Sequence, residues 1–167
     1  SFILGGQIKG EAMRMFLVYA AGNFIEATRE TPYFQIGESK YGKPILDRVI
    51  TPATTLEQAA KCALVSMDST LKSNLSVGLP LDLLVYRVDD LKSEDFVCID
   101  EHNPYYQFIR STWGQKLRDV FESIEDPCWD GGMYRQRSHP AAIARKRASL
   151  LSVRYSLGVD AAIFMHP

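Results

Sequence analysis

The sequence lacks any run of about 18 apolar residues, the length that a membrane-spanning helix needs. Its first residues also lack the basic stretch followed by an apolar one that marks a secretory signal. We therefore expect a cytoplasmic protein without a membrane partner.

Cysteine and histidine are scarce, with three of each among 167 residues. The cysteines have neither the even number of a disulfide framework nor the spacing of metal ligands, so we interpret Cys62 and Cys98 as small apolar residues. No histidine has a cysteine or acid at the spacing of a catalytic triad or metal site. The glycine pairs 5–6 and 131–132 lack the context of a phosphate-binding loop. The sequence therefore predicts no cofactor.

The overall composition is that of a folded domain. Hydrophobic residues make up 46% of the chain and charged residues 23%, values typical of a globular protein and unlike those of a disordered one. The chain is long enough to bury a core, and no internal repeat or low-complexity linker interrupts it.

Residues 54 to 86 carry the clearest local pattern, a helix followed by a Ser-rich turn and a strand. Thr54 and Glu57 have the spacing of a capping box, which satisfies backbone N–H groups of the first helical turn. Apolar residues then recur every three or four positions and predict a helix of about 17 residues. They are Leu56, Ala60, Ala63 or Leu64, Met67 and Leu71. After Gly78 and Pro80, LDLLVYRV is an apolar run typical of a buried strand.

The remaining elements follow from similar signals. FILGGQI, MRMFLVYA, GNFIEAT, PYFQIG and FVCID are predicted strands. A helix is predicted over residues 39–50, where Pro44 suits a first helical position. Another helix begins at Asn103 and Pro104. Its apolar face consists of Tyr106, Ile109, Trp113, Leu117, Val120 or Phe121, and Ile124. Strands followed by helices indicate an α+β fold, in the order expected of half of an αββα sandwich.

Four segments resemble the Anbu family, a bacterial branch of the proteasome and HslV peptidases. They are SFILGGQIKG, GNFIEAT, TPYFQIGESKYGKPILDRVI and DSTLKSNLSVGLPLDLLVY. The resemblance as a whole covers residues 1 to 126 approximately. The resemblance implies an N-terminal-nucleophile hydrolase with a four-layer αββα sandwich. That sandwich would be incomplete in this chain, because the family places SFILGG inside the domain.

The resemblance implies the activity of a threonine peptidase. In the family an N-terminal Thr supplies both the attacking hydroxyl and the amine that serves as its base. That Thr would precede Ser1, so we expect residues 1–132 to be the C-terminal part of a subunit that is inactive alone. The implied partners are a peptide or unfolded-protein substrate and further copies in a homo-oligomer. The alternative is an inactive truncated fragment that acts at most as an assembly or interaction module.

The resemblance also implies where supporting residues lie. In the family a Ser in the turn before one helix holds the amine of the nucleophile, which must be oriented and must pass on its proton. The corresponding turn here is Gly37, Glu38 and Ser39, where the family has Gly-Ser-Gly, so either Ser39 or Glu38 can take the role.

An Asp and a Ser in the turn after the next helix complete the family's support. The candidates here are Asp68, Ser73 and Ser76, and Ser76 best matches the family Ser by its distance to the following strand. Each residue can instead serve only as a cap or turn residue. Backbone carbonyls of residues 68–76 are candidate cation ligands, because similar turns bind cations in the family, but whether a metal binds is left open.

Residues 133–167 match nothing in the resembled family, whose sequences end near CWDGG. They hold one acid, Asp160, and six basic residues: Arg135, Arg137, Arg145, Lys146, Arg147 and Arg154. Two origins are open, translation past a normal stop or frameshift, which we favour, and a natural extension. A short basic cluster is typical of a solvated face, so no nucleic-acid partner is predicted. We expect this basic tail to be disordered or unpacked.

Overall fold

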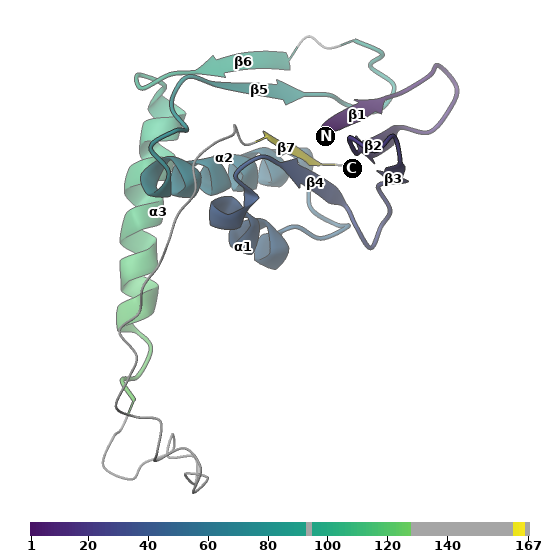
Figure 1. Ribbon diagram of the computed structural model, residues 1–167. Helices are drawn as coiled ribbons and strands as arrows, with labels where there is room; N and C mark the ends of the chain where they lie inside the picture. Colours follow the sequence, from purple (N-terminus) through teal and green to yellow (C-terminus); the bar gives the residue numbers. More distant parts are fainter. Residues whose placement is uncertain (93–94, 128–161, 166–167) are drawn as a thin grey trace, which may run out of the picture. The chain divides into compact units, whose positions relative to one another are not determined.

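The computed structural model describes residues 1–92, 95–127 and 162–165. Within them the elements follow the order β1, β2, β3, β4, α1, α2, β5, β6, α3 and β7 (Figure 1). The chain divides into two compact units, of which the first holds residues 1–113 and β7, and the second begins at Gly114. The fold is therefore a mixed one, with helices and small antiparallel sheets. No helix in the described ranges is long and apolar enough to cross a membrane.

The first sheet consists of β1 (Phe2–Gly6), β2 (Arg14–Val18) and β3 (Phe24–Glu26), paired antiparallel in chain order. The turn from β2 to β3 contains Gly22 at a φ of 86°, a conformation that glycine adopts at little cost. Met15 is buried in this sheet. Several apolar side chains of the same sheet are exposed, namely Phe2, Leu4, Phe24 and Ile25.

The strand β4 (Tyr33–Ile36) pairs antiparallel with β7 (Ala162–Met165), with Phe34 opposite Phe164. The strand β7 is the part of the predicted tail that the structure describes. The rest of residues 133–167 lies outside the described residues, so the division of the chain at residue 132 stays a prediction.

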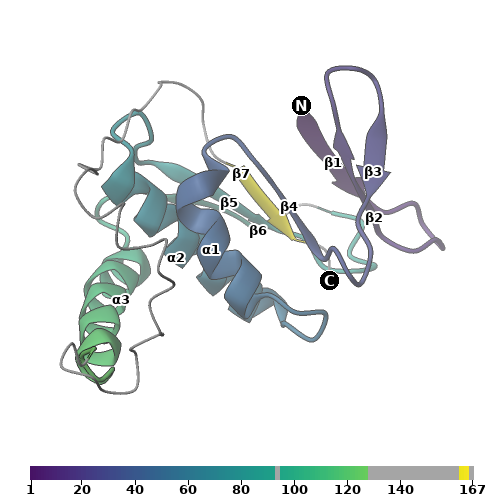
Figure 2. The same ribbon diagram turned by 60° about the horizontal axis from the view of Figure 1, so that its bottom comes forward.

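The helices α1 (Ser39–Val49) and α2 (Leu56–Ser73) lie side by side (Figure 2). Their close approach depends on Gly42, because a Cβ atom at that position would stand 2.0 Å from Ser66 Oγ. Leu46 of α1 is completely buried. The contact therefore requires a residue without a side chain on α1 opposite a small one on α2.

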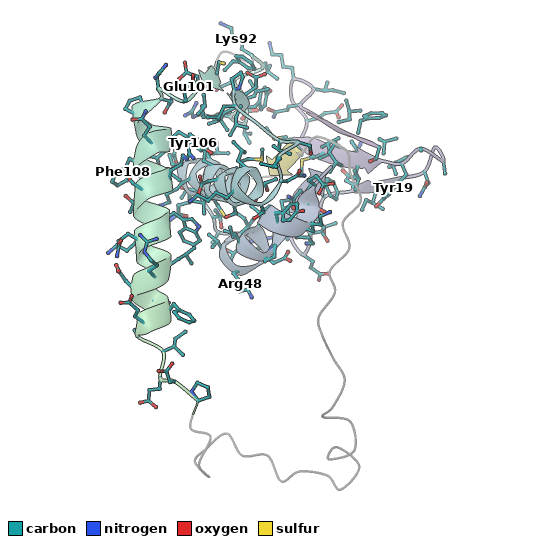
Figure 3. The ribbon with its side chains drawn as sticks, turned by 60° about the vertical axis from the view of Figure 1, so that its left-hand side comes forward. Tyr19, Arg48, Lys92, Glu101, Tyr106 and Phe108 are labelled. Carbon is teal, nitrogen blue, oxygen red and sulfur yellow. The ribbon has the colours of Figure 1, made fainter. Side chains whose placement is uncertain are left out.

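The hairpin of β5 (Leu81–Val85) and β6 (Asp95–Ile99) packs with the first part of α3 (Pro104–Glu122). The core that they share with α2 consists of Leu64, Ile99, Tyr106 and Ile109, with Val65, Leu79, Leu81 and Leu83 packed against it. On α3, Tyr106 is buried and Phe108 points away into solvent (Figure 3). Burial of these apolar groups supplies the main driving force for packing the hairpin and helix together.

The predicted strands and helices are all present, and Asn103 caps α3 as expected by accepting the Tyr106 N–H at 3.0 Å. Two local predictions are wrong. The capping box of α2 joins Thr55 and Gln58, one position later than predicted. Pro44 lies inside α1, because that helix begins five residues earlier at Ser39.

Two predicted burial patterns also differ from the structure. The strand β5 alternates between half-buried and exposed residues, because one of its faces is open to solvent, and so it is not the buried strand that the apolar run predicted. On α2, the members of the predicted stripe are not fully buried except for Leu64, and the buried set includes the polar residues Ser66, Asp68 and Thr70. Helix contacts on two sides of α2 explain this pattern, which a single stripe does not describe.

Candidate functional site

The turn after α2 follows from the way in which the helix ends. Asn74 donates its N–H to the Thr70 carbonyl at 2.9 Å, but its φ of −136° and ψ of 112° are extended, so the helix stops there. The Val77 N–H then donates to the Asn74 carbonyl at 3.3 Å. Ser76 lies in the turn that this second hydrogen bond closes, and its side chain is exposed.

Two hydrogen bonds join Ser76 to the same side-chain oxygen of Asn74. The backbone N–H of Ser76 lies 3.0 Å from Asn74 Oδ1, and the Ser76 hydroxyl lies 2.8 Å from the same oxygen. Sequence reasoning missed Asn74. The available signal was an Asn two positions before a Ser, the spacing at which an Asx side chain bonds to the backbone. Ser73 is the last residue of α2 and is also exposed.

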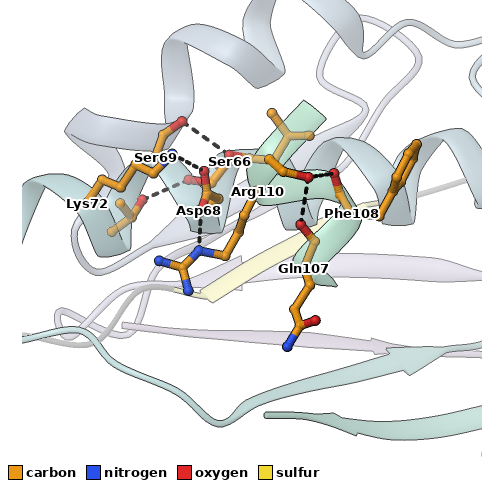
Figure 4. Close-up of polar contacts among 10 residues, drawn as sticks. Ser66, Asp68, Ser69, Lys72, Gln107, Phe108 and Arg110 are labelled. Atoms are coloured by element: carbon orange, nitrogen blue, oxygen red, sulfur yellow. Dashed lines mark hydrogen bonds and ion pairs between the residues drawn. The ribbon is translucent and has the colours of Figure 1, made fainter. Parts of the chain in front are cut away.

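Asp68 does not lie in this turn. It stands inside α2 with 1% of its surface exposed, and it forms ion pairs with Lys72 Nζ at 3.1 Å and Arg110 Nε at 3.3 Å (Figure 4). Neither pair has hydrogen-bond geometry, so both carboxylate oxygens are without a hydrogen bond among the described residues. The placement of Asp68 in the turn after the helix is therefore wrong, because α2 extends to Ser73.

The surroundings of Asp68 come from α3. Arg110 lies over the Tyr106 ring at 5.9 Å. The Arg110 side chain extends from α3 to Asp68 (Figure 4). Burial raises the pKa of Tyr106, and the nearby Asp68 charge raises it further. The cluster thus places one buried carboxylate between two half-exposed cations, an arrangement that holds α2 to the first part of α3.

The turn before α1 is built differently. Gly37 has a φ of 80°, and the Ser39 N–H donates to the Gly37 carbonyl at 2.8 Å. Ser39 is the first residue of α1, half-buried, and Glu38 precedes it without capping the helix through its side chain. The Glu38 carboxylate instead pairs with Lys40 Nζ at 3.0 Å.

A polar network holds this turn between β4 and α1. Lys43 Nζ lies 2.9 Å from the Tyr33 hydroxyl and 2.7 Å from Asp47 Oδ1, and the Tyr33 hydroxyl also donates to Asp47. The hydrogen bonds from Lys43 and Tyr33 lower the pKa of Asp47. These residues fix the strand and the helix on either side of residues 37–39.

The described structure does not bring all the candidates together. Asp68 faces α3 and Ser76 contacts Asn74, while none of the hydrogen bonds or ion pairs within the described ranges joins Ser39 to either. Among the described residues no group of three or more His, Cys, Asp and Glu could hold a metal ion. The turn after α2 is therefore the better-defined part of the candidate site.

One apolar hollow lies away from these residues. It has a volume of about 420 Å³ and is lined by α1, α2 and α3 side chains that include Ile45, Val49, Cys62 and Trp113. Burial raises the pKa of the Cys62 thiol to about 11, so this cysteine is protonated at neutral pH. The interpretation of Cys62 as a small apolar residue agrees with this environment.

Comparison with known proteins places the chain in a class. No family model matches the sequence, and no curated protein matches it. Solved structures do match. Anbu (ancestral beta-subunit) from Yersinia bercovieri is 57% identical, with a TM-score of 0.73 over 75% of this chain and 53% of the other. Anbu from Hyphomicrobium sp. strain MC1 is 51% identical, with a TM-score of 0.73 over 75% of this chain and 54% of the other.

A third match is the helical assembly of the Anbu complex from Pseudomonas aeruginosa, which is 51% identical, with a TM-score of 0.74 over 76% of this chain and 53% of the other. These matches define the class as proteasome-like. Within that class, the chain belongs to the Anbu family. It spans about half the length of the solved structures that it matches.

Proposed function

We propose that this chain is the C-terminal part of a proteasome-type threonine peptidase subunit and supplies the groups that hold the nucleophile's amine. The observation that carries the proposal is the 57% identity to Anbu over 75% of the chain, together with an exposed Ser76 hydroxyl in the turn after α2. In such an enzyme the N-terminal Thr attacks the peptide carbonyl and forms an acyl-enzyme that water then hydrolyses. The Thr would come from the part of the subunit that this sequence does not span.

Three features of the described chain support this role. Ser76 is exposed in a turn whose backbone is fixed at Asn74, so its oxygen is available to an amine. Ser73, the last residue of α2, is exposed as well. Ser39 is half-buried at the start of α1, in a turn held by the network of Lys43 and Asp47.

Asp68 takes an indirect role in this proposal. A carboxylate that is 1% exposed and paired with Arg110 cannot reach a substrate, but it holds α2 against α3 and so fixes the helix end that precedes Ser73. Ser76, Ser73 and Ser39 remain the proposed supporting residues that face the amine.

The proposal includes the fold and assembly of the whole subunit. We propose that the described sheets and helices are one part of a four-layer αββα sandwich, because apolar side chains of the first sheet such as Phe2 and Phe24 are exposed in this chain. The substrate would be a peptide or an unfolded protein, and the enzyme a cytoplasmic homo-oligomer. A matched relative is described as a helical assembly, which supports the oligomer.

Complementation tests the function. The chain would be expressed together with the N-terminal segment of the Yersinia bercovieri Anbu protein that it does not match, and hydrolysis of fluorogenic peptides would be measured. Turnover is expected, and Ser76→Ala should lower kcat by about one to two orders of magnitude, the effect of losing a hydrogen bond worth about 1 to 3 kcal/mol.

The matched control is Ser111→Ala on α3. The Ser111 hydroxyl bonds the Gln107 and Phe108 carbonyls of its own helix at 3.1 Å, so its loss should leave kcat unchanged. Absence of turnover in an assembly that is folded would contradict the peptidase proposal and favour the alternative, an assembly or interaction module. The exposed apolar side chains of β1 and β3 are the observation that supports that alternative.

A further inference from the structure

The contact between Asn74 and Ser76 determines to which atom the Ser76 hydroxyl donates its proton. A backbone N–H can only donate, so the amide atom of Asn74 that lies 3.0 Å from the Ser76 nitrogen must be the oxygen. The Ser76 hydroxyl lies 2.8 Å from that same oxygen and must therefore donate its proton to it. This assignment follows from the heavy atoms alone.

The direction of that proton determines what Ser76 can do for another group. Because the single hydroxyl hydrogen of Ser76 is donated to Asn74, the Ser76 oxygen can act toward another group only as an acceptor, through its lone pairs. It can accept an N–H from an amine, but it cannot donate to the amine's nitrogen. An amine bound in this way keeps its own lone pair free.

The geometry points to Asn74 as a positioning residue that acts through Ser76. The inference rests on the proposed function, in which an N-terminal amine takes the proton of the nucleophile's hydroxyl. If Ser76 were free to rotate, its hydroxyl could donate to the amine lone pair and occupy the site that must receive that proton. Asn74 prevents this by making Ser76 an acceptor only.

Asn74 is also held firmly enough for this role. It is half-buried, and its backbone N–H and carbonyl both take part in hydrogen bonds, with Thr70 and Val77 respectively. The Asn74 side chain is therefore attached to a backbone that is held in place, and its Oδ1 accepts the N–H of Ser76, two residues further on. No other candidate residue in the described chain contacts Ser76 through its side chain.

The pH profile of the complemented enzyme tests this directly. Hydrogen bonding to the protonated amine favours that form, whereas donation to the neutral amine favours the neutral form. Asn74→Ala should therefore lower the pKa seen in the acid limb of kcat/KM and reduce kcat by about tenfold. Asn74→Asp keeps the acceptor oxygen and adds negative charge, so it should retain kcat and move the acid limb to higher pH.

Epistasis separates a positioning role from a structural one. In a Ser76→Ala background there is no hydroxyl to orient, so Asn74→Ala should cause less than a twofold further loss of kcat. An equal loss from Asn74→Ala with and without the Ser76 hydroxyl would overturn the inference. So would acid limbs that coincide in wild type, Asn74→Ala and Asn74→Asp.

Amide hydrogen exchange of the full 167-residue chain gives a readout that does not need activity. Exchange at the Ser76 N–H should accelerate in Asn74→Ala and stay unchanged in Asn74→Asp. Unaltered exchange in Asn74→Ala would overturn the contact itself. If exchange responds as expected but the complemented assembly shows no turnover, the proposed function has failed and the Asn74 contact stands.

Discussion

Polar side chains on the buried face of α2 and in the turn that follows α2 differ in their exposure to solvent. Asp68 is enclosed between α2 and α3 with Arg110 and Lys72 beside it. Eight residues further along the chain, Ser76 is exposed and its hydroxyl donates a hydrogen bond to Asn74. Both are polar residues near one end of a helix, but the first is enclosed by packed helices and the second faces solvent.

The difference has a simple physical cause. A carboxylate removed from water must be compensated by nearby charge, so its partners are determined by packing and it is costly to change. A hydroxyl in an exposed turn is satisfied by one local bond or by water, so stability constrains it little. Substitutions in the two regions should therefore differ in what they affect.

The largest expected loss of stability comes from the buried face of α2. Gly42→Ala would place a methyl group 2.0 Å from Ser66 Oγ and 3.0 Å from the Ser66 carbonyl, so the helices must separate. Overpacking of this kind costs about 1 to 3 kcal/mol or somewhat more, and urea unfolding of the chain would measure it. Adding Ser66→Ala should restore part of the loss. Stability equal to wild type in Gly42→Ala would show that α1 and α2 are not in close contact.

A smaller loss is expected at the Asp68 cluster. Arg110→Met keeps most of the side-chain volume but leaves the buried carboxylate with Lys72 alone, which should lower the unfolding free energy by about 1 kcal/mol. The estimate is below that for a fully buried pair because Arg110 is half-exposed and a second cation remains. Arg118→Met is the control, since Arg118 bonds Gln115 of its own helix at 2.8 Å. If both variants unfold alike, Asp68 does not hold the two helices together.

The smallest effect on stability is expected in the turn. Ser76→Ala removes an exposed hydroxyl but retains the Ser76 backbone bond to Asn74, so the unfolding free energy should change by less than about 0.5 kcal/mol. The same denaturant titration would measure it. A loss as large as that of Arg110→Met would place Ser76 among the structural residues and remove the contrast between the two regions.

Much of the local structure was readable from the sequence, because it depends on short-range signals. Asn103 and Pro104 predicted the start of α3, and the Gly and Pro after α2 marked the passage to β5. The errors also have local causes. Thr54 and Thr55 are both good caps with a Glu or Gln three residues later, so the pattern alone did not select between them.

The environment of the candidate site was not readable in the same way. Asp68 was assigned to a turn because the resembled family has an Asp in the turn after this helix, whereas α2 continues beyond Asp68 to Ser73. Its burial depends on Arg110, which is 42 positions away and carried no signal of its own. Asn74 was missed because its part in the site depends on a side chain that turns back to Ser76.

By itself the sequence determined the family to which the chain belongs, the order of its elements and the serines worth testing. These follow from residue identity and from spacing along the chain, because they depend on interactions between residues that are close in sequence and on resemblance to a known family. Only the tertiary structure decided which polar groups are enclosed and which face solvent. That distinction depends on the packing of α1 and α3 against α2, where the cost of burying a charge or a methyl group is determined by residues far apart in the sequence.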